Sequence, residues 1–244
     1  AEGRKVLSES ESKAILRAFH IPTAQASVVR SPNEALVQAE NLGFPVALKI
    51  NSPDITHKSD AGGVHLAQRG EITVLAGGDA ALVEEMRPAL EAIGDPVLHI
   101  GPLGSSAVIK VITNMLAFIH LVAAGEGMML AAKQGVDLGA AYRAIRASSG
   151  NSFVHETESQ LILNGSYNIN FTMDLACKDL GFADQIADKL DVPLELGSVT
   201  RQIFKRARNL YGGDAWSPQV VKMLEDACKQ PLRAPGFPET LVAE

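Results

Sequence analysis

The sequence predicts an α/β N-terminal part, with a small and mostly parallel sheet flanked by helices, followed by an all-helical domain. Two observations carry this prediction. Up to about residue 100, short strand-like runs alternate with helical runs, which is the pattern of a parallel sheet. From Gly101 onward, apolar residues recur at helical spacing, and Gly, Pro, Asn and Asp separate the segments. We therefore divide the chain into an α/β domain (1–100), a helical domain (101–230) and an irregular tail (231–244).

The first elements fall within residues 8–50. Ser8 and Glu11 match a capping box at the start of a helix, which Pro22 ends. A strand at 24–29 follows. Then come a helix that opens with Pro32 and a strand at 44–50. This strand–helix–strand unit favours parallel pairing.

Residues 51–70 are polar and rich in turn-forming residues, so they predict a loop. Beyond it we expect a strand at 71–75, a helix at 80–93 that Pro88 kinks or breaks, and a strand at 96–100. The four predicted strands could form one sheet covered by helices. The helical domain is expected to contain helices at 104–134, 137–148, 154–163, 172–190, 193–211 and 217–228.

The composition limits the classes of partner and binding site that we expect. The net charge of −6 argues against a nucleic-acid partner, because phosphate contacts need a basic surface. The two cysteines, Cys177 and Cys228, are too few for a disulfide framework or a zinc cluster, so we predict no metal site and buried, reduced thiols.

The one stretch near membrane length, 107–124, contains Lys110, Asn114 and His120, so we interpret it as a buried core helix. We expect a cytoplasmic protein without a signal peptide or membrane contacts.

The segment 101–114, GPLGSSAVIKVITN, is the most informative in the chain. Its glycines allow close approach to the backbone, and a helix N-terminus suits an anionic ligand. Lys110 and Asn114 are four residues apart and share one helix face. Their apolar neighbours predict a largely buried helix, in which an ammonium is costly unless it is paired or exchanges protons. The alternative is a lysine whose stem packs while its ammonium reaches water.

A second candidate lies in MDLACKDL, where Asp174 and Lys178 have the spacing of an ion pair along one helix. Taken alone, this pattern indicates a surface pair worth a few tenths of a kcal/mol.

Residues 71–229 resemble the C-terminal part of the β-hydroxyacid dehydrogenases, the family of 3-hydroxyisobutyrate dehydrogenase and tartronate semialdehyde reductase. The resemblance rests on HIGPLGSSAVIKVITNML and FTMDLACKDLGFA, with ITVLAGGD, GVDLGAAYRAI and SSGNS in matching order. It implies a helical domain like the C-terminal domain of 6-phosphogluconate dehydrogenase. It also implies NAD- or NADP-dependent oxidation of a small 3-hydroxy acid, or reduction of its semialdehyde, and a homodimer or larger assembly formed through the helical domain.

The resemblance also implies residue roles. Lys110 would act as general acid/base on the substrate hydroxyl, and Asn114 would orient the substrate. Lys178, with Asp179 beside it, would lie near substrate and cofactor. The remaining matches border or bind the substrate: Gly62, Gly63, Ser149, Gly150 and Asn151.

Three departures from the family pattern matter. The chain contains no G-x-G-x-x-G turn, which holds the dinucleotide in the family, so only the last strands of that domain (65–100) are matched. Ala61 stands where the family has a serine that binds the substrate carboxylate. Ser106 stands where the helix motif has glycine. We therefore expect little or no dehydrogenase activity from this chain on its own.

Residues 7–64 resemble a different family, the ATP-grasp domain of NDP-forming acyl-CoA synthetases, through PVALKI and SPDITHKSDAGGV. This resemblance implies ATP with magnesium as ligand, a phosphate contact from Lys49, and a nearby Gly-rich loop with His57 and Lys58. The family's magnesium-binding carboxylates have no match, and the lysines could equally be solvated. Both families carry Gly-Gly-Val at the join near Gly62, which suggests a chimera formed by natural or engineered recombination, or an artefact of sequence assembly.

Three functions stay open from the sequence: a dehydrogenase, an ATP-binding fragment, and a non-catalytic helical dimerisation module whose N-terminal strands replace lost strands of the sheet.

Overall fold

The computed structural model describes residues 38, 47–49, 64–66, 73–91 and 94–241. They belong to two compact units, divided between Lys110 and Val111, and each unit is considered by itself. The helices predicted within 8–43 lie outside the described residues except for residue 38, and so does the strand predicted at 24–29.

The described strands of the first unit form two separate sheets. β1 (Ala47–Lys49) pairs antiparallel with β2 (Val64–Leu66), and β3 (Val74–Gly77) pairs parallel with β4 (Val97–Gly101). The parallel arrangement is confirmed for β3 and β4. The single sheet expected to join the strand predicted at 44–50 to this pair is wrong, because β1 lies in a separate sheet. So is the loop expected at residues 64–66. The apolar–polar–apolar run of β2 suits a strand, but it is too short to stand out from its polar surroundings.

The parallel pair has a small core in which Leu90 packs against the buried Val74 and Val97. Two short helices accompany the pair, α3 (Ala80–Glu85) and α4 (Arg87–Glu91). The predicted break is confirmed, because Pro88 falls in the first turn of α4, where its missing N–H leaves no bond unmade.

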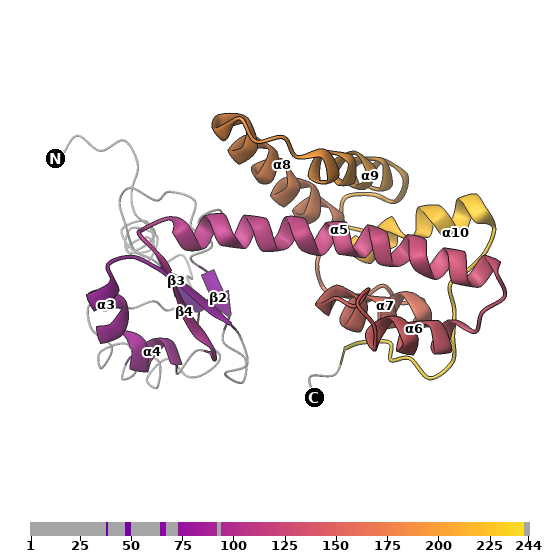
Figure 1. The fold of residues 1–244 in the computed structure, drawn as a ribbon, viewed down its shortest axis with the longest axis horizontal. Coiled ribbons are helices and arrows are strands. Elements are labelled where there is room, and N and C mark those ends of the chain that lie inside the picture. Colours follow the sequence, from indigo (N-terminus) through magenta and orange to yellow (C-terminus); the bar gives the residue numbers. More distant parts are fainter. Residues whose placement is uncertain (1–37, 39–46, 50–63, 67–72, 92–93, 242–244) are drawn as a thin grey trace, which may run out of the picture. The chain divides into compact units, whose positions relative to one another are not determined.

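The second unit is helical, and α5 starts before the boundary and runs into it (Figure 1). Every helix predicted from residue 104 onward is confirmed to within a few residues, and the last divides into a 3-10 turn and a short helix. The elements are α5 (Ser105–Lys133), α6 (Leu138–Arg146), α7 (Phe153–Asn164), α8 (Met173–Leu190), α9 (Glu195–Tyr211), η1 (Ser217–Val220) and α10 (Lys222–Cys228).

Local signals explain these helix starts. Asp137, Ser152 and Thr172 each accept a hydrogen bond from a backbone N–H in the first turn of α6, α7 and α8. Figure 1 shows α8 and α9 as a hairpin of two neighbouring helices, and α6 beside α7. The core lies along α5, where the Phe118 ring contacts those of Phe171 and Phe204 with centroids 5.8 and 5.1 Å apart.

The large burial expected for the helix around Lys110 is wrong. The buried positions of α5 begin only at Phe118 and continue through Leu121, Gly125, Met128 and Met129. Ile112, Leu116 and Leu130 are exposed, and 11% of the most apolar 18-residue stretch of α5 is buried. Among the helices that the structure describes, α5 is long and apolar enough to cross a membrane, by length and composition only. Apolar composition predicted burial, but it does not say which side of a helix finds a partner.

The C-terminal segment after α10 has no helix or strand in its described part, yet it is anchored. Leu232 is fully buried, and the Ala234 N–H donates to Leu163 O at 3.1 Å. Farther on, the Phe237 ring meets Tyr142 edge-on at 5.0 Å. Asn164 Nδ2 donates to Phe237 O at 3.0 Å.

Candidate functional site

Three of the predicted site residues meet in the helical unit. Asn114 of α5 donates through Nδ2 to Asp179 Oδ2 of α8 at 2.6 Å. Lys178 Nζ lies 3.6 Å from the other carboxylate oxygen, Asp179 Oδ1. The Asp179 side chain is 15% exposed and that of Lys178 39%, so the carboxylate is shielded while the ammonium reaches solvent.

The packing of the two helices explains this meeting. Asn114 lies one turn before the buried Phe118, at the end of the core-facing side of α5. In α8, Met173, Ala176 and Leu180 turn into the core, which leaves Asp179 at the edge of the buried side and Lys178 more exposed. Local helix patterns therefore bring together residues that are 65 positions apart.

The cluster of Asn114, Lys178 and Asp179 combines an amide, an ammonium and a carboxylate. The ammonium also lies 5.8 Å from the centroid of the Phe182 ring, which favours a cation. An ammonium beside an amide suits an anionic, hydroxylated small molecule, because both groups form directed hydrogen bonds with carboxylate and hydroxyl oxygens.

Lys110 lies four residues before Asn114 on α5 and is exposed. The burial that singled it out from composition is absent, so its role in proton transfer stays a prediction that rests on the resemblance.

The other predicted residues divide into two groups. Ser149, Gly150 and Asn151 are exposed in the turn between α6 and α7, where Asn151 Nδ2 donates to Glu156 Oε1 at 2.7 Å. That bond, together with the nearby Arg146, lowers the pKa of Glu156. Lys49 lies in β1, while Gly62, Gly63, His57 and Lys58 lie outside the described residues.

The ion pairs of α8 differ from the predicted one. Asp174 pairs with Arg208 of α9, and Asp184 pairs with Arg201. Lys178 pairs with its neighbour Asp179. The sequence spacing of Asp174 and Lys178 gave no information about α9, which supplies a basic side chain on the adjoining helix.

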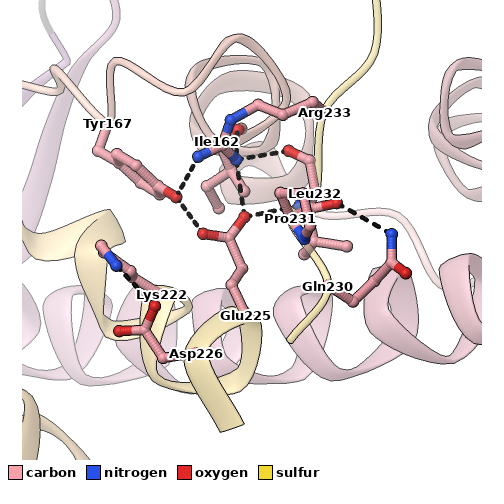
Figure 2. Close-up of polar contacts among 9 residues, drawn as sticks. All are labelled: Ile162, Tyr167, Lys222, Glu225, Asp226, Gln230, Pro231, Leu232 and Arg233. Carbon is pink, nitrogen blue, oxygen red and sulfur yellow. Dashed lines mark hydrogen bonds and ion pairs between the residues drawn. The ribbon is translucent and has the colours of Figure 1, made fainter. Parts of the chain in front are cut away.

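A buried polar cluster around Glu225 was not predicted (Figure 2). Glu225 is 6% exposed, and its Oε1 accepts from Leu232 N and Arg233 Nη1, both at 2.7 Å. Its Oε2 accepts from the Tyr167 hydroxyl. Arg233 Nη2 in turn donates to the Tyr167 hydroxyl oxygen at 2.9 Å. Burial, followed by the hydrogen bond to Glu225, raises the pKa of Tyr167. The cluster binds the C-terminal segment to α7 and α10 and is closed on itself, so we interpret it as structural. The available signal was the position of Glu225, four residues after Val221 and three before Cys228, which places it on the apolar side of a predicted helix.

A buried His–Ser pair has the same character. Ser159 Oγ lies 3.1 Å from His155 Nδ1, as in a nucleophile and its base, but His155 Nε2 lies 3.0 Å from Tyr142 O. Both side chains are almost fully buried, so no substrate reaches them. In the described part of the chain, no group of three or more His, Cys, Asp or Glu side chains is placed to hold a metal ion.

Comparison with known proteins identifies two regions. The protein-family model described as "NAD-binding of NADP-dependent 3-hydroxyisobutyrate dehydrogenase" matches residues 104–224. An ATP-grasp domain model matches residues 1–115, beyond the resemblance we ended at Val64. Most of that stretch lies outside the described residues, and binding of ATP stays a prediction.

Relatives agree with the first match. The chain is 33% identical over 164 residues to the L-threonate dehydrogenase of Haemophilus influenzae, covering 67% of this chain and 54% of the relative. It is 30% identical to the 2-(hydroxymethyl)glutarate dehydrogenase of Eubacterium barkeri, covering 68% and 55%. The chain thus spans about half the length of the curated relatives it matches.

A solved structure, 3-hydroxyisobutyrate dehydrogenase from Salmonella typhimurium, matches with a TM-score of 0.59 and 29% identity, over 79% of this chain and 66% of that one. The enzyme of the same name from Mycobacterium tuberculosis, at 22% identity, also has a TM-score of 0.59 and supports the fold alone. Residues 104–224 therefore form a 3-hydroxyisobutyrate dehydrogenase-like C-terminal domain.

Proposed function

We propose that this chain carries the substrate side of an NAD- or NADP-dependent dehydrogenase acting on a small 3-hydroxy acid or its semialdehyde. The observation that carries the proposal is the meeting of Asn114, Lys178 and Asp179 between α5 and α8. The named substrates of the relatives, L-threonate and 2-(hydroxymethyl)glutarate, combine carboxylate and hydroxyl groups, which suits this cluster.

In the proposed site, each side chain has one task. The Lys178 ammonium binds anionic oxygen, and Asn114 orients the substrate through its amide. Lys110, one turn before Asn114, gives a proton to the carbonyl oxygen of the semialdehyde or takes one from the hydroxyl. Ser149, Gly150 and Asn151 would border the substrate.

The residues present do not fit a complete dinucleotide site. A dinucleotide fold holds the pyrophosphate at a Gly-rich turn between a strand and a helix, and the sequence has no G-x-G-x-x-G. The structure describes two glycine-containing turns from a strand into a helix. The turn between β4 and α5 has only Gly101 and Gly104, which do not match G-x-G-x-x-G. The turn between β3 and α3 places Asp79 at the helix N-terminus, where its Oδ1 accepts from Leu82 N at 3.0 Å. A carboxylate at that position repels a phosphate. We infer that this chain alone does not hold NAD(P), and we derive no hydride step from it.

Calorimetric titration tests the substrate side. We expect 3-hydroxyisobutyrate or L-threonate to bind the purified chain, and Lys178→Met to weaken binding about tenfold, the effect of removing a charged hydrogen bond. Lys189→Met is the matched control, because Lys189 is an exposed lysine in the last turn of the same helix. Equal binding by both variants would contradict the proposed role of Lys178.

Parallel titrations test the cofactor. NADH and NADPH should not saturate the chain in the micromolar range, and micromolar binding of either would contradict our inference that the site is incomplete. Saturable binding of ATP with magnesium would instead support the ATP-grasp interpretation of residues 1–64.

A second candidate function is assembly, with or without catalysis. We propose that the helical unit forms a homodimer in the cytoplasm through the uncovered side of α5. Ile112, Leu116 and Leu130 are exposed on that side, and Leu130 is 70% exposed. Large apolar side chains left in water favour association. A monomeric mass at micromolar concentration in light scattering would contradict this proposal, and co-flotation with lipid vesicles would contradict the cytoplasmic location.

A further inference from the structure

The hydrogen bond between Asn114 and Asp179 fixes more than the spacing of two helices. A side-chain amide has a donor end and an acceptor end, whereas a carboxylate offers only acceptors. Asp179 can therefore bond only the Nδ2 end of Asn114, and the 2.6 Å contact with Oδ2 is of that kind.

We infer that Asp179 is a positioning residue that sets the orientation of the Asn114 amide, so that its acceptor end, Oδ1, is turned away from α8; the inference rests on the proposed function. The terminal torsion of an asparagine has two broad wells that exchange the amide ends. A carboxylate beside one end selects one of them, because the flipped amide would place oxygen against oxygen. An acceptor fixed in this way binds a substrate hydroxyl, which donates, in preference to a carbonyl, which cannot.

The same carboxylate also holds Lys178. Its Oδ1 lies 3.6 Å from Lys178 Nζ, while Oδ2 takes the amide, so one shielded group constrains two residues of the proposed site. A carboxylate at 15% exposure is costly unless it is well bonded, and these two contacts offset that cost. The inference assigns Asp179 an action through Asn114 and Lys178, without a contact of its own to the substrate.

Exchanging the two side chains separates positioning from a simple tie between helices. Asp179→Asn removes the carboxylate and lets the Asn114 amide flip. The double variant Asn114→Asp with Asp179→Asn restores one amide–carboxylate hydrogen bond between α5 and α8, but it presents a carboxylate where the amide stood. We expect Asp179→Asn to weaken binding of 3-hydroxyisobutyrate about five- to tenfold. The exchanged pair should recover the melting temperature but not the affinity.

Nitrogen-15 NMR of the side-chain amides reports the orientation of the Asn114 amide directly, with or without substrate. In the wild-type chain, one Asn114 amide proton should shift downfield, and this shift should disappear in Asp179→Asn. An Asn114 resonance unchanged by Asp179→Asn would overturn the inference, and so would full recovery of affinity in the exchanged pair. If the wild-type chain bound no hydroxy acid, the proposed function would fail and its substrate preference with it. The amide resonances would still decide the orientation.

Discussion

Two glycines of α5, two residues apart, should respond oppositely to the same substitution. Gly125 is buried, and a Cβ added there would lie 2.6 Å from Val221 Cγ2 and 2.9 Å from Val221 Cγ1. A Cβ added at Gly127 would meet nothing within 4 Å. Both positions lie inside one regular helix, so their conformational terms are nearly equal.

The expected magnitudes follow from two effects. Replacing Gly by Ala inside a helix stabilises it by about 1 kcal/mol. At Gly125 this gain is opposed by overpacking, because the Val221 methyl groups must move by about 1 Å to reach normal contact, at a cost of about 1–3 kcal/mol. Gly127→Ala should therefore raise the free energy of unfolding by about 0.5–1 kcal/mol. The free energy of unfolding of Gly125→Ala should be about 1–3 kcal/mol lower than that of Gly127→Ala.

Urea unfolding followed by circular dichroism measures both variants in one assay, with the unfolding slope checked for constancy. The double variant Gly125→Ala with Val221→Ala should show a favourable coupling, because the smaller residue makes room for the added methyl group. Equal stability of the two glycine variants, or no coupling to Val221, would refute the placement of α5 against the start of α10.

Three further perturbations probe the helical unit. Glu158 has a shielded Oε2 without a hydrogen-bond partner among the described residues, and burial raises the pKa of this carboxyl to about 8. Because this pKa is raised in the folded state, the carboxyl contributes stability that is present below about pH 4.5 and is lost as pH rises through about 8. Glu158→Gln does not titrate, so between pH 5 and pH 9 its free energy of unfolding should gain up to about 4 kcal/mol relative to wild type, as measured by urea titrations. Parallel pH profiles would contradict this. The raised pKa of Tyr167 likewise gives stability that is lost above about pH 10, so Tyr167→Phe should lose about 1 kcal/mol at pH 7 and depend less on pH in the alkaline range. A steeper alkaline loss in the variant would be the opposite result. Leu116→Glu should shift light-scattering mass from dimer to monomer without changing the helical content, and an unchanged mass would exclude this side of α5 as the interface.

The helices could be predicted because their signals are local. Asp137, Ser152 and Thr172 mark helix starts directly in the sequence, and the apolar spacing of α8 fixes which side is buried. Asn114 and Lys178 could be singled out for the same reason, as members of recognisable helical motifs.

The errors and omissions concern pairings between distant segments. The β1–β2 sheet joins runs of only three residues, which periodicity cannot detect. The exposure of α5 depends on what covers it, and composition does not say. The Glu225 cluster unites α7, α10 and the C-terminal segment, and the bond of Asn114 to Asp179 crosses 65 positions. Such contacts depend on how the helices pack. Individual residues could therefore be singled out from the sequence, but the residues they contact could not.

The central claim, that α5 and α8 together form a hydroxy-acid site, is tested most directly by nitrogen-15 NMR of the intact chain titrated with 3-hydroxyisobutyrate. We predict saturable shifts of the Asn114 side-chain amide and of the Lys178 and Asp179 backbone amides, and no comparable shift at Lys189. Saturable binding that left these three residues unperturbed would place the site elsewhere and contradict the claim.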